Sequence, residues 1–212
     1  MRTLAEDVHQ LNGVPPNAIN VYLVGDMLVD AGTPSAKRRI LRQLDGHDVR
    51  AHVVTHAHAD HFGASHAVCA ELGLPLWTGA TDADAIERGR PQLPAKGIGL
   101  MLSKMKPPPA HAVARRLREG DDIGHGFSVL DAPGHTLGHI ALWREADRTL
   151  ILGDVFFNLR RPGPPPGFLT IDPALNRASM RRLAQLRPAL TLFGHGAPLR
   201  DPDRLARAVD SE

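Results

Sequence analysis

A dense cluster of metal-ligand side chains constrains this chain more than any other sequence feature. Within six consecutive residues, the cluster contains three histidines and one aspartate: His56, His58, Asp60 and His61. The apolar run from Ala51 to Val54 directly precedes it, which predicts a buried strand that ends in this loop. Imidazole and carboxylate groups together bind borderline divalent ions such as zinc, iron or manganese. The sequence therefore predicts a metal-binding loop at a strand end.

Three further ligand candidates, His135, Asp154 and His195, each follow an apolar stretch that predicts a strand. These stretches cover residues 128–131, 149–152 and 190–193. Each candidate is next to a glycine, which lets the backbone turn sharply and lets other groups approach closely. Ligands that stand at the ends of several strands gather at one edge of a sheet. We therefore expect these residues to share one site with the loop 55–61.

The remaining pattern mixes strands and helices. Apolar runs at 19–24 and 27–30 flank Gly25-Asp26 and predict a hairpin. Helical periodicity covers residues 35–44, 64–72, 173–186 and 201–209, and a shorter helix is expected at 81–88. The proline-rich segment 89–109 is less regular, and we interpret it as an insertion or lid.

Composition and charge exclude several functional classes. Lys and Arg number 25 against 23 Asp and Glu, and no basic block appears, so we expect no nucleic-acid partner. The single cysteine, Cys69, excludes an intrachain disulfide. No run approaches the roughly 20 apolar residues of a membrane span, and the N-terminus lacks the apolar core of a signal peptide. We therefore expect a cytoplasmic protein with a small-molecule substrate, and its oligomeric state stays open.

Four motifs resemble those of the metallo-β-lactamase superfamily. Thr-His-Ala-His-Ala-Asp-His at 55–61 is similar to its HxHxDH motif. Its later motifs resemble Pro-Gly-His-Thr-Leu-Gly-His at 133–139, Gly-Asp at 153–154 and Gly-His-Gly at 194–196. The resemblance implies an α/β fold over a single domain, 1–212: the four-layer αβ/βα sandwich, in which helices flank two β-sheets. It also implies two divalent metal ions at one edge of the sandwich. We expect these ions to be zinc, with iron or manganese as alternatives.

The resemblance also implies a ligand set for each of the two ions. The first ion would be bound by His56, His58 and His135. The second ion would be bound by Asp60, His61 and His195. Asp154 would bridge the two ions.

Four other residues are expected to support this site. His139 and Asp30 would orient the ligands through hydrogen bonds without binding metal. Phe157 and Asn158 follow Asp154 closely, so they are expected to border the substrate pocket. The amide of Asn158 would donate a hydrogen bond to a substrate oxygen.

The reaction that such a site implies is hydrolysis. Two divalent ions about 3.5–4 Å apart share a hydroxide that is a nucleophile at neutral pH. We expect it to attack an ester, thioester, lactone or amide of a small molecule. The catalytic set is expected to include His58, Asp154 and Asp60, and Asp60 would also steer a proton to the leaving group.

Details of the motifs separate the branches of the superfamily. Its true β-lactamases usually carry cysteine where this chain has Asp154, whereas an aspartate there resembles the glyoxalase II and lactonase branches. The C-terminal helical part of glyoxalase II is not expected after His195, which argues against a strict glyoxalase II. An alternative is a mononuclear-iron oxygenase similar to the persulfide dioxygenases, which use the equivalents of His56, His135 and Asp154. The motifs are also compatible with a nuclease of the same superfamily and with a metal-binding protein that is not an enzyme.

Overall fold

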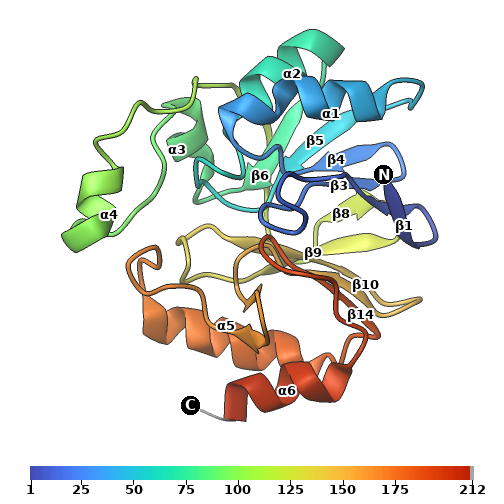
Figure 1. Cartoon of the computed structure of the whole chain (residues 1–212), viewed down its shortest axis with the longest axis vertical. Coiled ribbons are helices and arrows are strands. Elements are labelled where there is room, and N and C mark those ends of the chain that lie inside the picture. Colours follow the sequence, from blue (N-terminus) through green and yellow to red (C-terminus); the bar gives the residue numbers. More distant parts are fainter. Residues whose placement is uncertain (211–212) are drawn as a thin grey trace.

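Two β-sheets form the centre of the computed structural model, which describes residues 1–210. Figure 1 shows the sheets face to face, with helices on both outer sides. The first sheet is covered by α1 (Lys37–Leu44), α2 (Ser65–Leu72) and α3 (Ala83–Glu87). The second sheet is covered by α5 (Pro173–Gln185) and α6 (Pro202–Asp210). This order of layers confirms the predicted αβ/βα sandwich.

The first sheet has seven strands in chain order, and its last four run parallel to one another. The strands are β1 (Arg2–Ala5), β2 (Val8–Gln10), β3 (Tyr22–Val24), β4 (Met27–Val29), β5 (Ala51–Val54), β6 (Leu76–Gly79) and β7 (Val113–Leu117). The predicted hairpin forms between β3 and β4. Since β5 is central and parallel to both neighbours, the loop after it leaves the sheet at the edge where parallel strands end.

The second sheet has five strands in the order β14-β11-β10-β9-β8. Their bounds are β8 (Asp122–Gly124), β9 (Phe127–Asp131), β10 (Ile140–Arg144), β11 (Thr149–Ile151) and β14 (Leu190–Leu192). Because β11 and β14 are parallel neighbours, the residues that follow them lie at the same edge. A small hairpin of β12 (Phe157–Asn158) and β13 (Pro162–Gly163) comes after β11.

The core consists of three apolar layers that follow from strand alternation. In β3, Tyr22 and Val24 face the second sheet, while Leu23 between them packs towards the helices of the first sheet. The same alternation in β11 places Ile151 between the sheets and Leu150 against the side of α5. Both sheets are thereby buried on two faces, which fixes their strand ends relative to one another.

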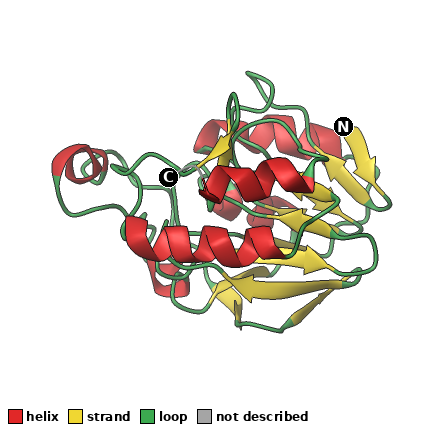
Figure 2. Cartoon of the chain, turned by 90° about the horizontal axis from the view of Figure 1, so that it is seen from below, coloured by secondary structure: helices red, strands yellow, loops and turns green. Residues whose placement is uncertain are grey.

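Figure 2 shows α5 and α6 next to each other over the second sheet. In both views, α4 (Gly97–Leu102) stands away from the body of the molecule, within the segment that the sequence predicts to be an insertion or lid. None of the helices formed by residues 1–210 has both the length and the apolar composition that crossing a bilayer requires.

Candidate metal centre

Seven ligand-type side chains meet where the loops after β5, β9, β11 and β14 come together. The first ligand group consists of His56, His58, His135 and Asp154. The second ligand group consists of Asp60, His61 and His195. Within each group, one ligand atom of every residue lies within 4.8 Å of the others. The structure thus brings together every ligand candidate that the sequence indicated.

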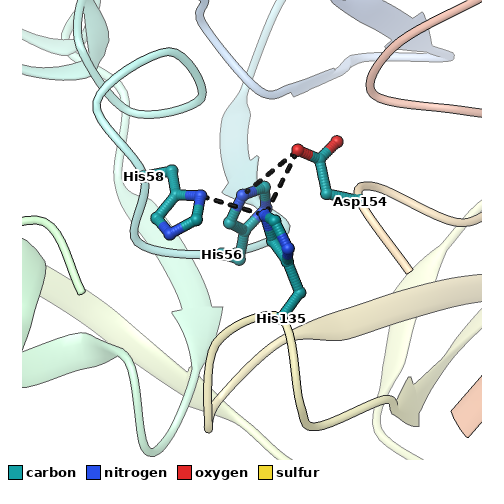
Figure 3. A group of neighbouring side chains, drawn as sticks. All are labelled: His56, His58, His135 and Asp154. Atoms are coloured by element: carbon teal, nitrogen blue, oxygen red, sulfur yellow. Dashed lines mark hydrogen bonds and ion pairs between the residues drawn. The ribbon is translucent and has the colours of Figure 1, made fainter. Parts of the chain in front are cut away.

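The first ligand group is completely enclosed by the protein, and Figure 3 shows its side chains pointing towards one another. His135 Nε2 lies 3.0 Å from His58 Nδ1 and 3.4 Å from Asp154 Oδ2. His56 Nε2 lies 3.8 Å from the same carboxylate oxygen. His58 turns Nδ1 inward because its Nε2–H donates to the Gln92 carbonyl at 2.6 Å. That hydrogen bond fixes the tautomer whose Nδ1 lone pair can bind a metal ion.

The second ligand group lies on the more open side. His195 Nε2 is 3.2 Å from Asp60 Oδ2 and 3.4 Å from His61 Nε2. The Asp60 side chain is 35% exposed and that of His195 is 13% exposed, whereas His61 is buried. His195 Nδ1–H donates to the Ala18 carbonyl, which orients its ring. Solvent therefore reaches the centre from the side of Asp60.

Asp154 Oδ2 lies between the two groups. Its distances to the imidazole Nε2 atoms are 3.8 Å for His56, 3.4 Å for His135, 3.4 Å for His61 and 3.2 Å for His195. Two of these nitrogens belong to each group, so this oxygen has the position that a bridging carboxylate requires. Gly194 makes the arrangement possible, because a Cβ atom at this residue would lie 2.0 Å from Asp154 Oδ1.

Two buried polar atoms of the first ligand group have no hydrogen-bond partner among residues 1–210. They are His56 Nε2 and Asp154 Oδ1. A buried nitrogen or carboxylate oxygen left unpaired costs free energy, and a bound cation removes that cost. His56 presents Nε2 to the site because its Nδ1 contacts the Thr55 hydroxyl at 3.0 Å. The donor set of imidazoles and carboxylates therefore fits a pair of divalent ions.

The two groups differ in charge when no metal is bound. Burial lowers the pKa of His58 to about 3 and that of His56 well below its usual value, so both rings are neutral. Burial also opposes protonation of His195, but the Asp154 carboxylate outweighs it and raises the pKa of His195 to about 10. Asp154 and Asp30 likewise raise the pKa of His61 against the effect of burial. Protons therefore compete with metal at His61 and His195, but not at His56 or His58.

Asp30 and His139 lie behind the ligands, where the sequence placed them. His61 Nδ1–H donates to Asp30 Oδ2 at 2.8 Å, and the Thr55 backbone N–H donates to Asp30 Oδ1 at 2.8 Å. His139 Nε2 accepts the backbone N–H of Asp154 at 3.0 Å. Neither residue belongs to a ligand group. Both hold a ligand or its backbone in a fixed orientation.

Asp82 is a buried carboxylate that the sequence did not reveal as part of the site. It lies just before α3 and accepts the Ala57 N–H at 2.7 Å. It also accepts the Thr136 hydroxyl at 2.6 Å and the Gly138 N–H at 2.7 Å. Asp82 therefore ties the loop that carries His58 to the loop that carries His135. In the sequence it resembles an ordinary residue of a short surface helix, because both partner loops are distant in the chain.

The two residues expected to border the substrate pocket have different environments. The Phe157 ring lies 4.4 Å from the His195 ring and 6.3 Å from the His135 ring, centroid to centroid, so it forms an apolar wall beside the ligands. Asn158 is nearly buried, and one N–H of its side-chain amide donates to the Ala197 carbonyl at 2.7 Å. The amide is thereby oriented by the backbone, and its second N–H is the one left for the expected contact with a substrate.

Comparison with known proteins agrees with the fold and the site. The sequence profile of the Metallo-beta-lactamase superfamily matches residues 14–195, and the chain belongs to this superfamily. Its relatives in Bacillus subtilis (strain 168) include two proteins described as probable metallo-hydrolases. YflN is 26% identical over 92% of this chain and 86% of its own length. YqjP is 30% identical over 92% of this chain and 73% of its own length. The chain is thus a metallo-hydrolase-like member of the superfamily with His/Asp metal-binding clusters.

Solved structures have the same architecture. TTHA1623, solved in a di-iron-bound form, is 29% identical and matches with a TM-score of 0.73 over 91% of this chain and 94% of that one. BJP-1, a subclass B3 metallo-beta-lactamase of Bradyrhizobium japonicum, matches with a TM-score of 0.75 over 99% of this chain and 89% of that one. At 21% identity, this second likeness concerns the fold alone. A hydroxyacylglutathione hydrolase of Bdellovibrio bacteriovorus is 31% identical, but over 53% of this chain and 36% of its own length.

Proposed function

We propose that this protein hydrolyses an ester, thioester, lactone or amide of a small molecule at a dinuclear metal centre. The observation that carries the proposal is the position of Asp154 Oδ2, which has two imidazole nitrogens of each ligand group around it. A carboxylate between two complete donor sets is what two neighbouring ions require. The proposed partner is a small-molecule substrate, without nucleic acid or membrane, and the proposed location is the cytoplasm.

The first ion would be held by His56, His58 and His135, and the second by Asp60, His61 and His195, with Asp154 between them. We propose zinc for both, since the imidazole and carboxylate ligands of each group are ones that zinc binds. The di-iron form of TTHA1623 supports two ions and keeps iron as the alternative. When bound, such ions supply a hydroxide nucleophile at neutral pH and polarise the substrate carbonyl.

The protein side chains have separate tasks in this reaction. Burial favours the neutral form of Asp60, but His61 and a hydrogen bond from His195 hold the pKa of Asp60 below its usual range. Asp60 is therefore ionised, partly exposed and able to take a proton from the attacking water to the leaving group. Phe157 covers the His195 ring and would exclude water from one side of the substrate. The partial relatives named hydroxyacylglutathione hydrolase favour an acyl compound as the substrate.

An oxygenase with a single iron is the second candidate. It would need only His56, His135 and Asp154, and these residues are present in the first ligand group. The persulfide dioxygenases keep a similar histidine motif but bind one iron, so the two candidates differ in whether the second ligand group holds an ion. Metal content therefore separates them.

The deciding experiment is metal quantification on protein purified without chelator, followed by a hydrolysis panel of lactones, thioesters, phosphodiesters and β-lactams. We expect about two ions per chain and hydrolysis of one acyl class. About one iron per chain with thiol-dependent oxygen uptake would contradict the proposal in favour of the oxygenase.

A variant of the first ligand group tests the link between metal and activity. We expect His135→Ala to lose metal and activity together, because it removes a buried ligand. His47→Ala is the control, since His47 is an exposed histidine in the turn after α1. An active, metal-free His135→Ala protein would refute the mechanism.

A further inference from the structure

A cavity of about 430 Å³ lies between the β12–β13 hairpin and α6, outside both ligand groups. Three arginines line it: Arg161 from the hairpin, and Arg204 and Arg207 from α6. The other lining residues that the structure describes are prolines, glycine and alanine, with no acidic side chain among them. We call this place the arginine cavity. It is large enough for a small metabolite.

The positive charges of the arginine cavity are weakly compensated. The guanidinium of Arg207 lies 3.5 Å from the carboxylate of Asp201, and the Arg207 side chain is 67% exposed. Arg204 donates to the Arg160 carbonyl at 3.1 Å, which is a neutral acceptor. Among residues 1–209, no hydrogen bond or ion pair involves the guanidinium of Arg161. Three like charges around one hollow repel one another, and an anion placed among them removes that repulsion.

The arrangement of the arginines also fits an anion sterically. Arg204 and Arg207 are three residues apart on α6, so their side chains leave the same face of the helix. Arg161 approaches from the hairpin, a segment far away in the sequence. Planar guanidinium groups that approach from two directions can donate hydrogen bonds to different sides of one anion.

The arginine cavity is separated from the metal centre by the hairpin. Gly163, which lines the cavity, pairs with Phe157 across the two strands. Phe157 in turn lies against the His195 ring, and Asn158 bridges to Gly196. A ligand in the cavity would therefore brace the hairpin without touching either ligand group.

We propose that the arginine cavity binds a small anion that carries a phosphoryl group. One guanidinium fork already matches both oxygens of a carboxylate, whereas a phosphoryl group offers three terminal oxygens and close to two negative charges. The three arginines supply enough N–H donors and positive charge to match the oxygens and the charge of a phosphoryl group. The phosphoryl group belongs either to free phosphate or to a phosphorylated metabolite that fills more of the cavity.

Calorimetric titration of the metal-loaded protein tests this site, with inorganic phosphate and ribose 5-phosphate as probes at constant chloride. We expect saturable binding at one site per chain. The double variant Arg204→Ala/Arg207→Ala should weaken binding about tenfold or more, which is a measurable change in Kd. Tighter binding of ribose 5-phosphate than of phosphate would identify a metabolite as the ligand, and the reverse would identify the free ion.

Two further variants separate a built site from bulk charge. Arg88→Ala is the matched control, because Arg88 is also 67% exposed and also makes one long ion pair, 3.4 Å to Asp84. It should leave Kd within about twofold of the wild type. Arg204→Lys/Arg207→Lys keeps the charge but loses the planar forks, so an intermediate Kd is expected. This variant also provides the test if the alanine variant does not fold, which thermal unfolding would reveal.

Three results would overturn the proposal. The first is no saturable binding of either probe up to about 10 mM. The second is unchanged binding in the double variants, which would place phosphate at the metal centre or elsewhere. The third is an equal loss in Arg88→Ala, which would reduce the effect to net charge.

Discussion

The two ligand groups share Asp154 but differ in burial, charge and support. The first is enclosed, and burial keeps the rings of His56 and His58 neutral. The second borders the open side and contains His195, whose pKa is raised to about 10 by Asp154. Neutral, pre-oriented ligands bind an ion without first losing protons, whereas the second group must release them. We therefore expect the first ion to bind more tightly than the second.

The two groups also differ in how firmly they are held and how accessible they are. The buried group can hold an ion permanently, because Asp82 ties together the two loops that carry His58 and His135. The second group is partly exposed, and Asp60 is accessible to water there. The first group is thus the more rigidly supported of the two, and the second is the more accessible.

The largest expected effect comes from Asp154→Asn. The amide keeps the shape but loses the negative charge next to both groups, so both ions should be lost. We expect activity to fall about 10³-fold or more and metal content, measured by mass spectrometry, to fall below one ion per chain. His195→Ala should instead remove the second ion only. If Asp154→Asn retained both ions, Asp154 would not be the bridging ligand.

Asp82→Asn tests the support of the first ligand group. An amide nitrogen in place of one carboxylate oxygen faces N–H and O–H donors, so at least one hydrogen bond is lost. We expect the affinity for the first ion to fall about 10- to 100-fold, measured by competition with a chromophoric chelator. Asp84→Asn is the control, since Asp84 is an exposed acid two residues away. Equal effects in both variants would mean that Asp82 has no special link to the metal loops.

The pH dependence of metal binding should differ between the two groups. His61 and His195 have raised pKa values, so they carry protons at neutral pH in the metal-free protein. The affinity for the second ion should therefore fall as the pH is lowered from 8 to 6, about tenfold per pH unit for each proton released. His56 and His58 have lowered pKa values, so they are already neutral in this range and add no such dependence. Parallel pH profiles for the two ions would refute the contrast.

The smallest expected effect comes from Phe157→Ala. Its ring packs beside the His195 ring without contributing a ligand atom, so both ions should stay bound. We expect a rise in KM of about three- to tenfold and a smaller change in kcat, because the variant removes apolar contact with the substrate. Steady-state kinetics together with metal content checks this. Loss of an ion from Phe157→Ala would show that the ring supports the second ligand group and not the substrate.

The sequence alone determined the ligand candidates and the layers of the fold. Apolar runs that end in Gly-His or Gly-Asp are local signals, because strand burial and a sharp turn depend on adjacent residues. Three such signals, together with the cluster at 56–61, predicted one shared centre, and the resemblance of these motifs to the metallo-β-lactamase superfamily implied the αβ/βα sandwich. The short strands β1, β2 and β7 were not predicted, since each is only three to five residues long and rich in polar side chains, and pairing in the sheet is what stabilises them.

Tertiary structure decided the partners of these residues. Asp82 joins two loops that are distant in the chain, the amide of Asn158 turns to a backbone carbonyl, and Arg161 meets α6 across the hairpin. No local pattern encodes such contacts, because they exist only when separate segments pack together. The motif around His56 to His61 thus specified what can bind a metal ion. The packing of two sheets decided which ligand-type side chains form each group, which of them hold protons and which side is open.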